Sequence, residues 1–126
     1  MIQRIQSLYL LIAIIIMVVA IVFFCNSTDI LNAHAVFPCL SGLSIILSTV
    51  ALLKYTNRRL QMKMANLSIV ILCVLIILPA IPIFNIEDQT ILTFRIQCAV
   101  ALLFNHMAWR AIRRDEKKVK DADRIR

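Results

Sequence analysis

Three polar side chains that could take part in chemistry interrupt an apolar stretch near the C-terminal end of the chain. They are Arg95, Asn105 and His106. On an α-helix, at about 100° per residue, these three and Trp109 share a face about 100° wide. Ionisable residues within a membrane span typically mark a route for a proton, an ion or a small substrate. Because an imidazole titrates near neutral pH, His106 would be the proton carrier on such a route.

The same residues fit a second interpretation, as anchors at the two boundaries of the membrane. Arg95 lies about 6 Å along the helix from the start of the apolar stretch, so its side chain can reach the acids of the preceding loop, Glu87 and Asp88. The other two polar residues lie within about one turn of Trp109, at the opposite boundary. Because no polar residue occupies Ala99–Phe104, a continuous relay would have a gap at its centre. We therefore favour the anchors.

The sequence predicts neither an enzyme nor a metalloprotein. The chain has a single glycine, Gly42, and a glycine-rich phosphate loop needs several. Its two histidines, His34 and His106, fall on opposite sides of the membrane in the topology set out below. No Cys/His spacing typical of a zinc site occurs. We expect no catalytic residues, no metal site and no cofactor.

Two of the four cysteines, Cys25 and Cys39, are placed where a disulfide could form. They lie near the ends of neighbouring apolar segments, on the side that faces an oxidising periplasm in the same topology. Cys73 and Cys98 lie inside apolar segments and are expected to pack as small apolar residues. A Cys25–Cys39 disulfide and a pair of free thiols are the two alternatives.

Four apolar segments make up most of the chain and must position these residues. Hydrophobic residues amount to 61% of the sequence, against about 45–50% in an ordinary soluble domain. The segments are Leu8–Cys25, Val36–Leu53, Met64–Phe84 and Ile91–Trp109, each 18 to 21 residues long, and the charged tail Arg110–Arg126 follows. About 20 apolar residues span the hydrocarbon core as a helix. We predict an all-α, single-domain bundle of four transmembrane helices in two antiparallel hairpins, with a cytoplasmic helical extension of the fourth helix.

Positive charge is concentrated at alternate ends of these segments. Thirteen of the fourteen Lys and Arg residues lie in three places, which are Arg4, the loop Lys54–Lys63 and the tail. The other two connections carry Asp29, Glu87 and Asp88 and no cation. The positive-inside rule then places both termini in the cytoplasm. Orientation and attraction to anionic headgroups account for the net charge of +7, so we expect contact with lipid and no binding of nucleic acid.

Two local patterns refine the predicted helices. Ser41, Ser44 and Ser48 share one face of the second helix, where small residues allow close packing and hydroxyls can bond to a neighbouring helix. A polar path lined by these serines is the alternative. In the third segment Pro79 lacks an N–H group, so the helix is predicted to kink or stop near Leu78.

Three stretches of the chain together resemble a known family. They are MIQRIQSLYLLIA at the start, NRRLQ (Asn57–Gln61) in the middle and AIRRDEKKVKDADRIR at the end. These stretches are similar to the small four-helix membrane proteins grouped as domain of unknown function 4293 and found in Bacteroidota. The resemblance implies an uncharacterised, multi-pass protein of a bacterial inner membrane. It brings no established activity, cofactor or site residue.

These observations lead to two hypotheses about function. In the first, the protein is an accessory or scaffolding protein whose basic cytoplasmic surface binds a membrane or cytosolic protein. The residues assigned to this surface are Arg4, Asn57, Arg58, Arg59, Gln61, Arg113, Arg114, Asp115, Asp123 and Arg124. In the second, the protein is a subunit of a small transporter or channel, with a pore between protomers of a homo-oligomer, that uses Arg95, Asn105 and His106.

Overall fold

The computed structural model describes residues 2–27, 33–82 and 88–125. The helices in these ranges are α1 (Ile2–Ser27), α2 (Val36–Leu53), α3 (Arg58–Ile77) and α4 (Asp88–Ile125), with short 3₁₀ helices η1 (Ala33–Ala35) and η2 (Leu78–Ala80). All four α-helices are long and apolar enough to cross a membrane. The described ranges contain no strand. The predicted all-α fold with four spanning helices is confirmed.

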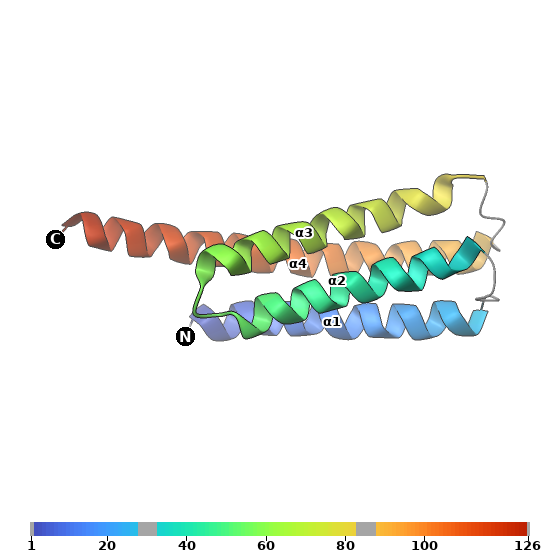
Figure 1. The fold of residues 1–126 in the computed structure, drawn as a ribbon, viewed down its shortest axis with the longest axis horizontal. Helices are drawn as coiled ribbons and strands as arrows, with labels where there is room; N and C mark the ends of the chain where they lie inside the picture. Colours follow the sequence, from blue (N-terminus) through green and yellow to red (C-terminus); the bar gives the residue numbers. More distant parts are fainter. Residues whose placement is uncertain (1, 28–32, 83–87, 126) are drawn as a thin grey trace.

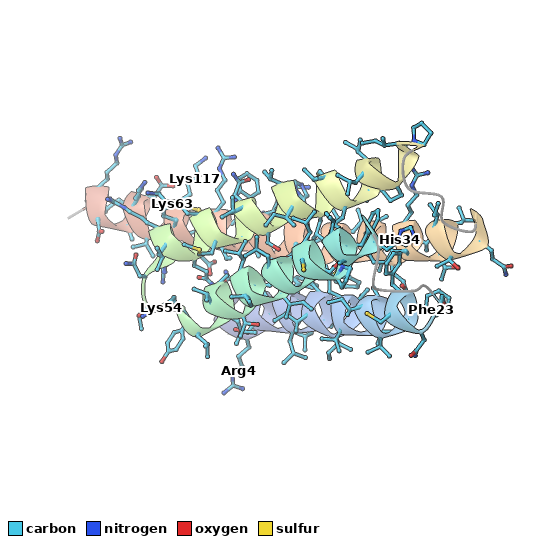
Figure 2. All side chains as sticks on the ribbon, turned by 45° about the vertical axis from the view of Figure 1, so that its right-hand side comes forward. Arg4, Phe23, His34, Lys54, Lys63 and Lys117 are labelled. Atoms are coloured by element: carbon cyan, nitrogen blue, oxygen red, sulfur yellow. The ribbon has the colours of Figure 1, made fainter. Side chains whose placement is uncertain are left out.

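The four helices lie side by side and alternate in direction along the chain (Figure 1). Each helix packs against its neighbours in sequence, and α4 closes the bundle by packing along α1. This is the up-and-down topology that short connections favour. The N-terminus, the α2–α3 turn and the C-terminal part of α4 meet at the same end (Figure 1). We call this the basic end, because Arg4, Lys54, Lys63 and Lys117 all lie toward it, whereas Phe23 and His34 lie toward the other (Figure 2).

Helix α4 runs without interruption for 38 residues, about 57 Å at 1.5 Å per residue. The sequence from Asp88 to Ile125 contains neither Pro nor Gly, so every residue can join the helical hydrogen-bond ladder. The prediction that the fourth helix continues into the charged tail is therefore confirmed. Its last turns extend beyond the other three helices at the basic end (Figure 1).

A repeating pattern of buried residues explains why the helices pack nearly parallel. On every helix the buried positions alternate in steps of four and three. They are Gln6, Leu10, Ala13, Met17, Ala20 and Phe24 in α1; Phe37, Ser41, Ser44, Ser48 and Ala51 in α2; Gln61, Ala65, Ser68, Leu72, Leu75 and Pro79 in α3 and η2; and Thr90, Phe94, Cys98, Ala101, Asn105, Ala108, Ile112 and Asp115 in α4. A repeat of about 3.5 residues produces the interlocking packing of coiled coils and helix bundles.

Aromatic rings fill the half of the bundle farther from the basic end. The centroids of Phe24 and Phe94 are 4.9 Å apart, those of Phe24 and Phe37 5.2 Å, and those of Phe37 and Phe94 6.0 Å. Leu72 and Leu75 of α3 belong to the same buried cluster. Tilted and edge-on ring pairs at such distances are the favourable arrangements. The three rings come from α1, α2 and α4, so these helices pack together around one apolar cluster.

The outward-facing side of the bundle is as apolar as its interior. Ile15 is 53% exposed, Ile46 60% and Leu103 60%. Soluble monomers rarely expose continuous apolar surface of this kind. Lipid chains are the solvent in which such side chains belong, as expected of a membrane-spanning bundle.

The two ends of α3 differ from the apolar segment predicted for it. The predicted loop Lys54–Lys63 is in fact a short turn, because α3 already begins at Arg58. Asn57 is the N-cap, and its side-chain oxygen accepts a hydrogen bond from the Leu60 N–H at 3.5 Å. At the other end α3 stops at Ile77 and passes into η2, as predicted from the missing N–H of Pro79.

Candidate functional site

A cluster of polar side chains lies inside the bundle, where α2, α3 and α4 meet. The hydroxyl of Ser68 in α3 is 3.0 Å from those of both Ser44 and Ser48 in α2. Ser48 also donates to the amide oxygen of Asn105 in α4 at 3.5 Å. All four residues are buried. In a bilayer such hydrogen bonds hold helices together, since burial in lipid alone gives helices little preference for one another.

The predicted serine face of α2 thus packs against its neighbours. Ser41, at the same face, donates back to the Phe37 carbonyl at 2.8 Å and stays within its own helix. Asn105 is 1% exposed, and its amide nitrogen has no hydrogen-bond partner among the described residues. Burial of an amide nitrogen without a hydrogen-bond partner is unfavourable. This nitrogen lies where hydrogen bonds link α2, α3 and α4.

Arg95 lies toward the other end of the bundle and is partly buried between α3 and α4. Its Nε donates to the backbone carbonyl of Ile76 at 3.2 Å. That carbonyl belongs to the last turn of α3, where the carbonyls lack partners within the helix. A cation beside it also meets the negative end of the helix dipole. The predicted partner Glu87 lies outside the described residues, as does the side chain of Asp88.

His106 points away from Asn105, to the outside of the bundle, and is exposed. Its ring stacks on that of Trp109 at a centroid distance of 5.8 Å and an interplanar angle of 28°. The guanidinium of Arg113 lies 5.2 Å from the centre of the same indole, a cation–π contact. The three residues of the predicted polar face are therefore in three different surroundings: Arg95 at the end of α3, Asn105 in the core and His106 outside.

A second buried polar contact lies at the basic end and was missed by sequence reasoning. The Gln6 amide of α1 donates to the Asp115 carboxylate of α4. Gln6 is 4% exposed and Asp115 9%. Both continue the buried repeat of their helices, which is the signal that could have identified them. The contact joins the first turns of α1 to the charged part of α4, so the helical tail is fixed to the bundle at this point.

The residues predicted to form one interaction surface do not all lie on the surface. Gln61, like Asp115, is buried and belongs to the interior. A groove of about 510 Å³ brings the α2–α3 turn together with α4. Its lining residues are Thr56, Asn57, Arg58, Arg59, Glu116, Val119 and Lys120. Lys120 forms a salt bridge of 3.2 Å with Glu116 along α4. Two regions far apart in sequence thus form one surface.

The remaining predicted surface residues lie around this groove. Arg113, Asp123 and Arg124 are exposed on α4. Arg4 is exposed on α1 and lines a separate hollow with Leu52 and Tyr55. Arg114 lines a third groove, between α1 and α4.

All four cysteines are free thiols, so the Cys25–Cys39 disulfide considered from the sequence is absent. Cys39 lies two residues from the buried Phe37, about 200° around α2, and is exposed. Within the described residues no group of three or more His, Cys, Asp or Glu side chains could hold a metal ion.

The fold and the distribution of polar groups fit a multi-pass α-helical membrane protein with a charged helical extension. The family to which this chain belongs is the one described as domain of unknown function (DUF4293), whose model matches residues 25–125. The family resemblance seen in the sequence is confirmed. Comparisons with curated proteins and with solved structures returned no match.

Proposed function

We propose that this protein is an accessory or scaffolding protein of a bacterial inner membrane, which presents its basic end to a protein partner in the cytoplasm. The charge distribution supports this orientation, since cations concentrate at that end and the positive-inside rule places them in the cytoplasm. The groove between the α2–α3 turn and α4 is the observation that carries the proposal. We propose no enzymatic role for it, since the sequence carries no catalytic motif.

The lining of this groove favours a partner with an acidic and partly apolar surface. Arg58, Arg59 and Lys120 outnumber the single acid, Glu116. Val119 adds an apolar contact that is 44% exposed. Interfaces of this kind combine an apolar centre with charged residues that select the partner.

The extension of α4 gives this surface a fixed shape. A solitary charged helix of about sixteen residues would be marginally stable in water. Here its first turns are held by the Gln6–Asp115 contact and by continuity with the transmembrane part of α4. A preorganised surface loses less conformational entropy on binding than a flexible tail. Ile125, which is 88% exposed near the free end, adds a further apolar contact.

Site-specific photo-crosslinking in native membranes tests the proposal. A photo-reactive residue placed at Val119 should yield one defined protein adduct, and the same residue placed at Ile46, on the lipid-facing side of α2, should yield lipid adducts only. The variant Arg59→Glu should abolish the protein adduct. The matched variant Lys54→Glu, an exposed cation of the same turn that does not line the groove, should leave the adduct in place.

Three outcomes would count against the proposal. They are recovery of lipid alone from Val119, the same protein adducts from both positions, and equal effects of Arg59→Glu and Lys54→Glu. A second copy of this chain as the adduct would assign the groove to self-association instead.

The second hypothesis, a transporter or channel subunit, finds less support. It requires Arg95, Asn105 and His106 to face one path. Arg95 instead bonds the end of α3, His106 lies outside, and Asn105 bonds a serine of α2. The aromatic cluster around Phe24 fills the bundle between the buried serines and the end opposite the basic end.

A further inference from the structure

A groove between α1 and α4 combines an apolar wall with a row of cations. It has a volume of about 340 Å³. The residues that line it are Ile5 and Tyr9 of α1 and Met107, Arg110, Ala111, Arg114, Asp115 and Lys118 of α4. Its position between α1 and α4 separates it from the groove proposed for the protein partner, which lies between the α2–α3 turn and α4.

The α4 side of this groove changes from apolar to cationic along a single face. Val100, Leu103 and Met107 are exposed apolar residues in steps of three and four. The same face then continues with three cations, the first of them three residues after Met107 and the next two in steps of four. They are Arg110, Arg114 and Lys118. An amphiphile lying along α4 would place its hydrocarbon chain against the apolar residues and its headgroup against the cations.

Two aromatic residues set the level of this change relative to the membrane. Tyr9 lies in the groove and Trp109 directly precedes Arg110. Tyr and Trp concentrate at the boundary between hydrocarbon and headgroups. Arg110 therefore lies at the depth of the lipid phosphates, and Arg114 lies about 6 Å farther along the helix.

The charge of the groove selects an anion. Three cations line it against one acid, Asp115, which is buried and accepts a hydrogen bond from Gln6. Arginine guanidinium groups match phosphate oxygens in geometry as well as in charge. An apolar wall formed by Ile5 and Met107 offers nothing to a small hydrophilic anion but fits an acyl chain.

We propose that this groove is a binding site for an anionic phospholipid, with its phosphate between Arg110 and Arg114 and an acyl chain along Met107 and Leu103. The site is independent of the proposed protein partner, because it requires only the protein and lipid. It goes beyond the general attraction of basic residues to a charged membrane, since it depends on two particular arginines and on the apolar wall between α1 and α4.

The single tryptophan of the chain makes a direct test possible. Trp109 does not line this groove but lines the adjoining hollow, which shares Arg110 and Arg114 with it, so a lipid phosphate between these arginines brings the first acyl carbons close to the indole. The purified protein is reconstituted in phosphatidylcholine vesicles that contain increasing fractions of phosphatidylglycerol brominated near the glycerol. Quenching of Trp109 should saturate at a low fraction of the brominated phosphatidylglycerol. In a parallel titration with brominated phosphatidylcholine, the quenching should rise only in proportion to the fraction of that lipid.

The double variant Arg110→Gln/Arg114→Gln should lower the selectivity for phosphatidylglycerol by about thirtyfold, because one cation near an anionic lipid surface contributes about fivefold. Arg110→Lys/Arg114→Lys should restore most of it. The control Lys63→Gln/Arg124→Gln removes the same charge from the basic end, at two exposed cations that line neither this groove nor the hollow around Trp109, and should leave the selectivity nearly unchanged. Circular dichroism of all variants should show unchanged helicity.

Several results would overturn the proposal. Equal quenching of the unmodified protein by both lipids would remove the selectivity itself. An equal loss in the control variant would assign the selectivity to the net charge of the basic end. Relief of quenching by millimolar glycerol phosphate would assign the site to a free phosphate, and preferential quenching by brominated phosphatidylethanolamine would assign it to a zwitterionic headgroup.

Discussion

The buried contact between Gln6 and Asp115 makes a quantitative prediction about stability. Gln6→Leu would leave a buried carboxylate without its amide donor. A hydrogen bond to a charged group contributes about 1.5–3 kcal/mol, and Arg114 and Lys118 line the groove beside Asp115, which favours the lower half of that range. We therefore expect Gln6→Leu to reduce the free energy of unfolding by about 2 kcal/mol.

The complementary change gives the second leg of a double-mutant cycle. Asp115→Ala would leave a buried amide without an acceptor, with an expected loss of about 1–2 kcal/mol. Removing both polar groups in Gln6→Leu/Asp115→Ala should cost only about 1 kcal/mol, because neither group then remains unpaired. The expected coupling energy is about 2–3 kcal/mol, well above the roughly 0.5 kcal/mol typical of independent sites.

Steric trapping of the doubly labelled protein in bicelles would measure all four free energies of unfolding under the same conditions. The tail should also become more accessible to protease in the single variants than in the double variant. If the double variant lost the sum of the two single losses in the free energy of unfolding, the Gln6–Asp115 contact would contribute nothing to stability. The inference that this contact fixes the tail to the bundle would then be wrong.

Three further predictions concern the core and the start of α3, with unfolding in bicelles as the measurement. Phe94→Ala should lower the free energy of unfolding by about 3–5 kcal/mol, since it removes one ring of the aromatic cluster. Phe23→Ala, on the exposed side of α1, should lower it by under about 1 kcal/mol. Equal losses in the two variants would contradict the packing. Ser68→Ala should cost about 0.5–1.5 kcal/mol because two interhelical contacts disappear, and Ser41→Ala, which loses a bond within its own helix, should cost less. Asn57→Ala should cost about 0.5–1 kcal/mol, the lower part of the range for an N-cap, and no loss at all would show that α3 begins without that cap.

The number and order of the helices followed from simple properties of the sequence. Segments near twenty apolar residues predicted four spans, and the absence of Pro and Gly predicted that α4 would run unbroken into the tail. Pro79 predicted the end of α3. The predicted loop Lys54–Lys63 placed the start of α3 too late, since the helix begins at Arg58. The charged residues suggested a loop, whereas Asn57 is a good N-cap in front of a helical segment.

The candidate site could be predicted only in part, because it depends on which helix faces are adjacent. Depth along the helix predicted Arg95 near a membrane boundary with an acidic partner, whereas the hydrogen-bond partner in the structure is a backbone carbonyl of α3, which no sequence pattern identifies. Gln61 and Asp115 looked like surface residues because of their polarity. The buried repeat in steps of four and three runs through both, so periodicity would have been the better guide than residue type.

The positions of the buried polar residues suggest why the bundle has a unique arrangement. In lipid, a helix that rotates or slides exchanges one apolar surface for another, and little free energy opposes the change. Polar groups differ, because each one that loses its partner within hydrocarbon is strongly disfavoured. The serine cluster, with Asn105, fixes α2 and α3 against α4 inside the bundle. The Gln6–Asp115 contact fixes α1 against α4 at the basic end. Since α4 takes part in both, the direction of its extension, and with it the shape of the proposed partner surface, is set by contacts inside the bundle.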